Sequence, residues 1–266
     1  IQYLKSHSQG LFQENPNLDS FLIISYLSGK SREWFYAHGD QNMETETYQN
    51  ICQMREKRAR GEPIAYLIGS KEFWGLTFMT DSRALIPRPE TEHLIETCLE
   101  QSKQLGKERI TLLDLCTGSG CIAISLAHEK NNWEITGSDI SQKALDLARE
   151  NEKALLKSNR IQWVQSDVFQ RLHERFDIIC SNPPYLNEYE MKNFDDHHWS
   201  EPRNALFGGY SGLDFYTHIT KESRDYLNTD GLLIFEASDW QTDAIIGIFK
   251  DNNFGKISVI KDLAGN

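Results

Sequence analysis

The chain has little of what marks small secreted proteins or membrane proteins. Its 266 residues contain five cysteines, an odd number with no CxxC pair, which favours reduced thiols over a disulfide framework. No apolar run reaches the roughly 18 residues of a membrane-spanning helix, and no signal peptide is visible. We therefore expect a cytoplasmic protein with no membrane partner. The chain begins at Ile1 rather than at methionine, so we expect residues to be missing before it.

Positive charge is also scarce. Lysine and arginine number 28 against 39 acidic residues, a formal net charge of −11, whereas phosphate binding requires clustered basic side chains. The one short basic run, at residues 57–60, is typical of a solvated helix end. No direct nucleic-acid partner is therefore expected. A hydrophobic content of 39% with 25% charged residues indicates a packed globular protein.

Residues 1–63 are predicted to form an N-terminal helical domain. The apolar run 18–27 stops at Gly29, and the polar-faced segment 45–60 stops at Gly61, and glycine is the residue that most often follows the end of a helix. This part of the chain carries few groups that do chemistry.

The rest of the chain is predicted to contain a linker and a larger domain. Residues 64–86 are expected to be a β-hairpin linker, because 64–80 is rich in aromatic and β-branched residues separated by glycines. In the larger domain, residues 87–266, a helix is expected to begin near Pro89, and strands and helices alternate from Arg109 on, which predicts an α/β fold with a doubly wound, mostly parallel sheet. The expected strands are 110–115, 133–138, 161–165, 176–180, 232–236 and 256–261, and the expected helices are 121–129, 142–157, 213–227 and 242–250.

A glycine-rich stretch follows the first of these strands. Residues 114–123 read DLCTGSGCIA, and Gly118 and Gly120 let the backbone turn tightly and approach a ligand. With Ala123 they match a relaxed dinucleotide-binding fingerprint. A tight turn with no ligand would also explain them, so the stretch by itself is a weak signal.

Acidic residues follow the next two strands, where ligands bind in such sheets. Asp139 lies at the position of a carboxylate that accepts hydrogen bonds from both ribose hydroxyls; its other explanation is a helix cap, a role that Ser141 can fill. Asp167 can accept from an adenine amino group or simply close a turn, and Val168 can pack on the adenine. Together they describe an adenosine pocket.

The stretch SNPPY, residues 181–185, indicates which adenosine compound binds there. The side chain of Asn182 and the carbonyl of Pro183 offer neighbouring acceptors, which match the two hydrogens of an –NH2 group. Tyr185 offers a ring face for a planar amide or base, and Pro184 is expected to aim that ring. These residues form a binding site for an amino group beside a methyl donor. They therefore favour S-adenosylmethionine over a nicotinamide dinucleotide as the bound compound.

NPPY, DLCTGSG and GSDIS together resemble the amino-methyltransferases that use S-adenosylmethionine. The fuller set of GEPIAYLIGSKEFWGL, LIPRPETEHLIE, SNPPYL, EPRNALFGGYSGLDFY and DLAGN, in this order over residues 61–266, resembles the HemK/PrmC family. Members of that family methylate the side-chain amide nitrogen of the glutamine in the GGQ motif of class 1 peptide chain release factors.

The resemblance implies a Rossmann-like methyltransferase domain and a release factor as protein partner, and the predicted fold suggests a monomer. It implies that the helical domain helps to seize the release factor. The implied cofactor-binding residues are Cys116, Thr117, Gly118, Ser119, Gly120, Asp139, Asp167, Val168 and Asn182. The implied substrate-binding residues are Asn182, Pro183, Pro184 and Tyr185, with Asn182, Pro183 and Tyr185 as the catalytic group.

The chain departs from the family pattern in two places. Cys116 stands where the family usually has glycine, and a cysteine is strained if the backbone there has a positive φ. The chain also stops at Asn266, where family members continue into a last strand, so we expect residues to be missing there.

Other polar residues are predicted to be structural. The run Asp195-Asp196-His197-His198 is interpreted as a solvated loop, and no metal is expected. Glu201 and Arg203 are expected to brace the long loop over the substrate. Arg88 either reaches the active site or forms a structural ion pair.

Three alternatives remain at this stage. An adenine-amino DNA methyltransferase would use the same binding site for a flipped base, but it should carry a basic recognition region that this acidic chain lacks. A nicotinamide-dependent oxidoreductase explains Asp139 but gives no role to residues 182–185. A non-catalytic adaptor that binds a translation factor would not need the acids at the strand ends.

Overall fold

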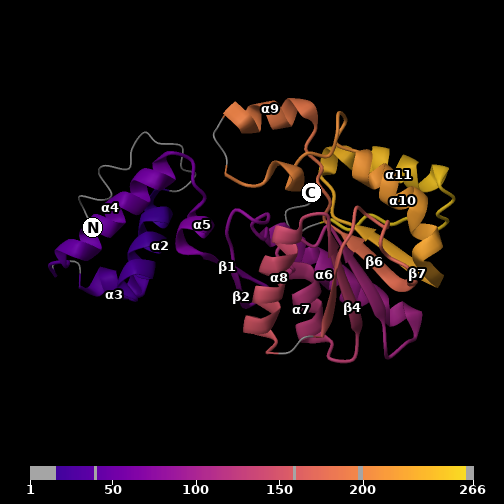
Figure 1. Cartoon of the computed structure of the whole chain (residues 1–266), viewed down its shortest axis with the longest axis horizontal. Coiled ribbons are helices and arrows are strands. Elements are labelled where there is room, and N and C mark those ends of the chain that lie inside the picture. Colours follow the sequence, from indigo (N-terminus) through magenta and orange to yellow (C-terminus); the bar gives the residue numbers. More distant parts are fainter. Residues whose placement is uncertain (1–15, 39–40, 158–159, 197–199, 262–266) are drawn as a thin grey trace. The chain divides into compact units, whose positions relative to one another are not determined.

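The structure is a computed structural model that describes residues 16–38, 41–157, 160–196 and 200–261. It contains two compact units, one within residues 1–70 and 194–200 and the other within residues 71–193 and 201–266 (Figure 1). None of the described helices is long and apolar enough to cross a membrane.

The first unit is helical, as predicted. Its helices are α2 Pro16–Ser28, α3 Arg32–Ala37, α4 Thr45–Ala59 and α5 Ile64–Ile68. Phe21 and Ile24 of α2, Phe35 of α3 and Ile51 of α4 are buried in one cluster, so the apolar faces of three short helices share a core. The Ser31 side chain accepts a hydrogen bond from the Trp34 N–H and caps α3.

Part of the predicted hairpin is wrong, because residues 64–68 form helix α5. The helix begins after Pro63 and ends at Gly69, whose φ of 77° lets its N–H bond back to the Ala65 carbonyl. The proline before residues 64–68 and the glycine after them thus favour a short helix, despite the β-branched composition of the segment. The hairpin itself is shorter, with β1 at Ser70–Phe73 and β2 at Leu76–Met79. Trp74 and Gly75 join these strands with positive φ angles of 52° and 65°, as tight hairpin turns require.

The second unit is built on a five-stranded parallel sheet in the order β5-β4-β3-β6-β7. The strands are β3 Thr111–Leu115, β4 Glu134–Asp139, β5 Ile161–Gln165, β6 Phe176–Ser181 and β7 Leu227–Phe235. The strand order reverses at β3, which has β4 on one side and β6 on the other. Ligands bind beyond the carboxyl ends of the strands at such a point, so the predicted fold class is confirmed and the place to search for a site is defined.

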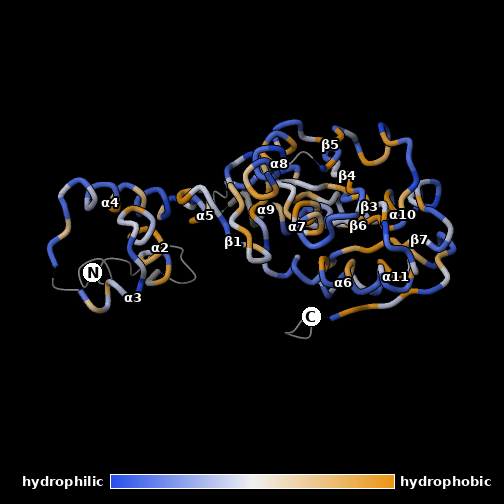
Figure 2. The backbone as a smooth tube through the Cα atoms, turned by 90° about the horizontal axis from the view of Figure 1, so that it is seen from below, coloured by the Kyte–Doolittle hydropathy of each residue, from blue (hydrophilic) through white to orange (hydrophobic). Residues whose placement is uncertain are grey.

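Helices cover both faces of this sheet. They are α6 Glu92–Ser102, α7 Cys121–Glu129, α8 Gln142–Leu155, α10 Asp214–Tyr226 and α11 Thr242–Asp251, and the 3-10 turn η1 Pro89–Thr91 precedes α6. A further helix, α9 Glu188–Asp196, lies in the long connection between β6 and α10. Leu112 and Ile178 pack in one core with α6 and α7, whereas Leu113 and Ile179 pack in another with Ile219 of α10. Side chains of successive strand residues point to opposite faces, which explains the two cores. In Figure 2 the tube of α6 alternates between hydrophobic and hydrophilic residues along its coil.

Several predicted elements differ from the structure; β7, for example, begins at Leu227 and not at residue 232. Residues 256–261 were expected to form a strand, but no described strand pairs with them, and Val259 and Ile260 are about half exposed. A strand needs a hydrogen-bonded neighbour, which the local sequence does not supply. Helix α10 ends one residue earlier than predicted, because the chain enters β7 at Leu227, and α9 lies inside the predicted long loop.

Candidate active site

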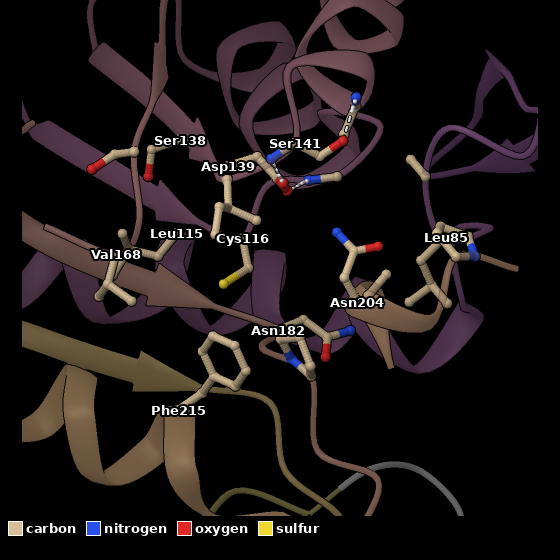
Figure 3. A pocket seen from close by; sticks show the side chains of 18 of the residues that line it. Leu85, Leu115, Cys116, Ser138, Asp139, Ser141, Val168, Asn182, Asn204 and Phe215 are labelled. Atoms are coloured by element: carbon tan, nitrogen blue, oxygen red, sulfur yellow. Dashed lines mark hydrogen bonds between the residues drawn. The ribbon is translucent and has the colours of Figure 1, made fainter. Parts of the chain in front are cut away.

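A cavity lies at the carboxyl ends of the sheet strands, as the predicted topology requires. It contains about 730 Å³ of space, part of which is open to solvent. Six of the predicted cofactor-binding residues line it (Figure 3). These are Cys116, Gly118, Asp139, Asp167, Val168 and Asn182. The cavity therefore gathers groups that follow β3, β4, β5 and β6.

Asp139 ends β4 and is held by the backbone on both sides. Its Oδ2 accepts from the Gly118 N–H at 2.9 Å, and its Oδ1 accepts from the Ser141 N–H at 2.8 Å. Burial raises the pKa of this carboxyl, and the backbone N–H groups of Ser141 and Gly118 oppose that rise. Ser141 caps α8 by accepting from the Ala144 N–H, as the sequence suggested. Asp139 is thus not needed as the cap, and its carboxylate lines the cavity as an acceptor for a ligand.

The glycine-rich turn has positive φ at Cys116, Gly118 and Gly120, with angles of 59°, 57° and 80°. A Cβ on Gly120 would lie 2.8 Å from a ring carbon of Trp163. Only glycine therefore lets the start of α7 lie this close to the Trp163 side chain. A Cβ on Gly118 would meet nothing nearer than 4.0 Å, so at that position the left-handed φ is what favours glycine. The backbone angle therefore favours glycine at both positions, and at Gly120 close packing excludes a side chain as well.

Cys116 adopts the left-handed conformation that a side chain disfavours. Its side chain lines the cavity, and its sulfur points toward Phe215 in Figure 3. Burial raises the pKa of the thiol, and the neighbouring Asp139 raises it further. A neutral, unreactive thiol thus forms part of the wall of the cavity.

Asp114 holds the glycine-rich turn in place through its carboxylate. It is completely buried, and its Oδ2 accepts hydrogen bonds from the Thr117 hydroxyl and from the Ala123 N–H at the start of α7. Burial raises its pKa to about 7. Thr117, Ser119 and Gly120 are buried and are not part of the cavity lining, so a cofactor contact from these three residues stays a prediction.

The residues after β5 contribute one polar and one apolar group. The Asp167 side chain is exposed and accepts from the Gln170 side chain at 3.0 Å. Val168 is buried, with a φ of 46°. With Leu115 and Phe215 it gives the cavity an apolar wall, which suits the faces of a planar ring.

Asn182 directly follows β6, and its carboxamide nitrogen is fully engaged. Nδ2 donates to the Thr91 hydroxyl at 3.1 Å and to Glu236 Oε1 at 2.9 Å. No hydrogen bond from a described residue reaches Oδ1, and Asn182 lines the cavity. The acceptor end of the amide is therefore the end left for a ligand.

The other three residues of NPPY divide between two places. Pro183 and Pro184 are buried, and Pro184 lines the same cavity as Asn182. Tyr185 instead lines a second, more open cavity together with Arg88 and Glu236. Burial raises the pKa of the Tyr185 hydroxyl, and the charge of Glu236 raises it further. NPPY thus lies between the two cavities.

Glu201 and Arg88 form an ion pair between segments 113 residues apart in the sequence. The buried carboxylate of Glu201 accepts from the Ile86 N–H at 3.0 Å and from Arg88 Nη2 at 2.5 Å. The structural interpretation of Glu201 agrees with these contacts, and Arg88 has the ion-pair partner that the sequence left open. The Arg203 guanidinium lies over the ring of Phe207.

Three residues near the site were missed by the sequence analysis. Asn204 and Phe215 line the cavity, and Glu236 binds Asn182. The rule that ligands collect at strand ends should have identified Glu236, which directly follows β7. Asn204 and Phe215 belong to quoted motifs but carry no local signal of their role.

The cavity fits S-adenosylmethionine in its donor set. Carboxylates lie at the ends of β4 and β5, the glycine turn follows β3 next to β4, and apolar side chains line the same cavity. Among the described residues, no group of three or more His, Cys, Asp or Glu side chains is arranged to hold a metal ion. The side chains of Asp195 and Asp196, and the neighbouring His197 and His198, lie outside the described residues.

Comparison with known proteins identifies both parts of the chain. Residues 91–197 match the Methyltransferase small domain, and residues 2–69 match the PrmC N-terminal domain. One solved structure with the same fold is the hMettl16 catalytic domain in complex with a MAT2A 3′UTR hairpin. It has a TM-score of 0.57 and 16% identity over 73% of this chain and 74% of that one.

Curated relatives cover nearly the whole chain. A release factor glutamine methyltransferase of Buchnera aphidicola subsp. Baizongia pistaciae is 37% identical over 93% of this chain and 88% of the relative. The proteins of the same description from Rhodopirellula baltica and Salmonella typhimurium are 35% and 34% identical, each over 95% of this chain and over 88% and 90% of the relative. The chain belongs to the release factor glutamine methyltransferase family.

Proposed function

We propose that this protein transfers a methyl group from S-adenosyl-L-methionine to the side-chain amide nitrogen of the glutamine in the GGQ motif of class 1 peptide chain release factors. The observation that carries the proposal is the orientation of Asn182. Its nitrogen is bound by Thr91 and Glu236, and its oxygen is left for a ligand. Family membership supports the choice of substrate.

The cofactor is held by groups that end the parallel strands. Asp139 accepts from the ribose hydroxyls, and Asp167 accepts from the adenine amino group. Val168 and Phe215 pack against the adenine ring. The turn of Cys116, Thr117, Gly118, Ser119 and Gly120 lets the backbone come close to the cofactor. Bound there, the cofactor supplies an electrophilic methyl group on a sulfonium and leaves as S-adenosyl-L-homocysteine.

The substrate amide is held by the chain after β6. Asn182 Oδ1 and the Pro183 carbonyl accept its two N–H hydrogens, while Pro184 and Tyr185 shape the wall beside it. An amide nitrogen is a weak nucleophile, because its lone pair is delocalised into the carbonyl group. Fixing it toward the methyl carbon supplies part of the roughly 7–11 kcal/mol that orientation can contribute.

Proton removal follows methyl transfer in this proposal. The neutral amide attacks first, so that the new C–N bond forms as the S–CH3 bond of the cofactor breaks; among the described residues no lysine or histidine lines the cavity beside Asn182, whereas His93 lines the second cavity. The amide proton then leaves to water. The catalytic work of Asn182, Pro183 and Tyr185 is positioning of the amide.

The two parts of the chain divide the task. Residues 1–63 recognise the release factor, and residues 64–86 link the two domains. Residues 87–266 bind the cofactor and catalyse methyl transfer. The enzyme acts in the cytoplasm as a monomer, without binding nucleic acid directly. The DNA methyltransferase alternative is not favoured, given the net charge of −11 and the relatives of the chain.

Mass spectrometry of a release factor incubated with the enzyme and labelled S-adenosylmethionine tests the proposal. We expect one added methyl group on the GGQ glutamine and none on a control release factor in which that glutamine is replaced by alanine. An unmodified glutamine would refute the proposal. A methylated duplex DNA in a parallel reaction would instead support the alternative.

A further inference from the structure

Three segments far apart in the sequence meet at the carboxamide of Asn182. Asn182 follows β6, Thr91 ends η1, and Glu236 follows β7. The Glu236 N–H donates to the Ser181 carbonyl at 3.1 Å. The backbone hydrogen bonding between β6 and β7 therefore continues up to the residue that precedes Asn182. Thr91 is buried. Each partner of the carboxamide is thus placed by secondary structure.

We propose that Glu236 is a positioning residue that, with Thr91, fixes which end of the Asn182 carboxamide faces the substrate. The inference rests on the proposed function, because it assigns Asn182 Oδ1 to the substrate amide. It adds a residue that belongs neither to the NPPY motif nor to the lining of the cavity at the strand ends.

The argument starts from the hydrogen-bonding capacity of the two groups. An ionised carboxylate only accepts, whereas a carboxamide donates through nitrogen and accepts through oxygen. With Nδ2 toward Glu236, both hydrogens of the nitrogen find acceptors, at 2.9 and 3.1 Å. Reversing the amide would place Oδ1 against a carboxylate oxygen at the same distance. The negative charge on Glu236 therefore selects one orientation.

The surroundings of Glu236 show that this arrangement is not what packing alone would favour. Its Oε2 is buried and has no hydrogen-bond partner among the described residues, although buried polar atoms are ordinarily satisfied. Burial raises the pKa of the carboxyl to about 7.

Several titratable and charged groups face Glu236. Glu90 of η1 raises its pKa, while Arg88, together with the hydrogen bonds of Thr91 and Asn182, lowers it. The other neighbours are Tyr185, Cys121 of α7 and Tyr216 of α10, whose hydroxyl donates to the Glu236 carbonyl at 2.9 Å. Tyr185, Cys121 and Tyr216 all have raised pKa values, so they stay neutral where Glu236 titrates.

Protonation of Glu236 removes the selection. A carboxylic acid can donate as well as accept, so either orientation of the Asn182 amide then finds partners. Fewer molecules present Oδ1 to the substrate, and turnover falls. Because the pKa is raised to about 7, we expect turnover to rise several-fold as the pH increases through about 7.

Three proteins test the inference, namely wild type, Glu236→Gln and Glu90→Gln. The glutamine introduced by Glu236→Gln has the size of the native glutamate but can donate and accept at any pH, so it imitates the protonated state. Glu90 is exposed and is not among the residues that bind the Asn182 carboxamide; its removal takes away a charge that raises the pKa of Glu236. The readout is kcat against pH at saturating release factor and S-adenosylmethionine, with cofactor affinity measured by calorimetry.

We expect Glu236→Gln to lower the plateau of kcat several-fold and to abolish the fall in kcat near pH 7, with unchanged cofactor affinity. Glu90→Gln should keep the plateau and move that fall to lower pH. The inference would be overturned if Glu236→Gln kept the wild-type plateau of kcat, or if its kcat still fell near pH 7. If Glu236→Gln does not fold, an unmoved pH profile in Glu90→Gln would overturn it. Failure of the proposed function is distinct, since wild type itself would then leave the glutamine unmodified.

Discussion

At the scale of single residues, Asn182 is the group on which the proposed chemistry depends. Asn182→Ala should leave cofactor affinity within about twofold, because Asp139 and Asp167 remain, and should lower kcat by about 100-fold, the cost of a misplaced reacting group. Calorimetry and single-turnover assays measure the two effects. Gln162→Ala, which removes an exposed amide on β5, is the control and should match wild type. Equal turnover in Asn182→Ala would remove Asn182 from the mechanism.

Cys116 offers a test of backbone strain. Its φ of 59° is one that side chains disfavour, by roughly 1–2 kcal/mol. Cys116→Ala and Cys116→Gly both remove the sulfur, but only glycine relieves the φ. Glycine also loses about 0.5–1 kcal/mol through its freer unfolded chain. We expect Cys116→Gly to be more stable than Cys116→Ala by about 0.5–1 kcal/mol in urea denaturation; the reverse order would show that the turn is unstrained.

At the scale of elements, Asn151 of α8 connects three parts of the second unit. Its side chain accepts from the Met79 N–H at 2.7 Å and donates to the carbonyls of Met79 and Ser119. The residue is fully buried. The hairpin strand β2 and the glycine turn are thus fixed to one helix by a single amide.

Asn151→Ala should therefore destabilise the protein by about 2–4 kcal/mol, because removing one partner leaves buried backbone groups unsatisfied. Urea denaturation measures the change. Lys153→Ala, an exposed position on the same helix, is the matched control and should lie within about 0.5 kcal/mol of wild type. A change in Asn151→Ala no larger than in the control would mean that the hairpin is held by apolar packing instead.

At the scale of the whole molecule, buried acids should make stability depend on pH. The pKa of Asp114 is raised from 3.8 to about 7 in the folded protein. A carboxyl group whose pKa is raised by folding makes its full contribution to stability below its unfolded pKa. This contribution is lost as the pH rises through about 7. Each pKa unit is worth about 1.4 kcal/mol, so the effect reaches a few kcal/mol.

Asp114→Asn should remove that dependence, because the amide oxygen can still accept from Thr117 and Ala123 but carries no charge. Relative to wild type, the variant should gain unfolding free energy from about pH 4 to about pH 7 and should gain no more by pH 8, where Asp114 is ionised in both states. Urea denaturation across this range, without cofactor, measures the difference. Parallel pH profiles for the two proteins would show that Asp114 does not titrate in the folded state.

The sequence by itself determined the parts of this protein that depend on short-range pattern. Alternating strands and helices specified a doubly wound sheet, because each pattern has its own period. Parallel strands share an edge, so the residues after β3, β4, β5 and β6 were predicted to meet, and six of the predicted cofactor residues line one cavity. The motif order identified the family, which the curated relatives confirm.

Tertiary structure decided what depends on distant partners. Residues 256–261 have a strand-like composition but no described neighbour to pair with, and Tyr185 faces a different cavity from Asn182. The orientation of the Asn182 amide was beyond the sequence, because its partners come from Thr91 and Glu236, 91 and 54 residues away. Hydrogen bonds between such distant groups form only after the sheet has brought them together, so no local pattern records them.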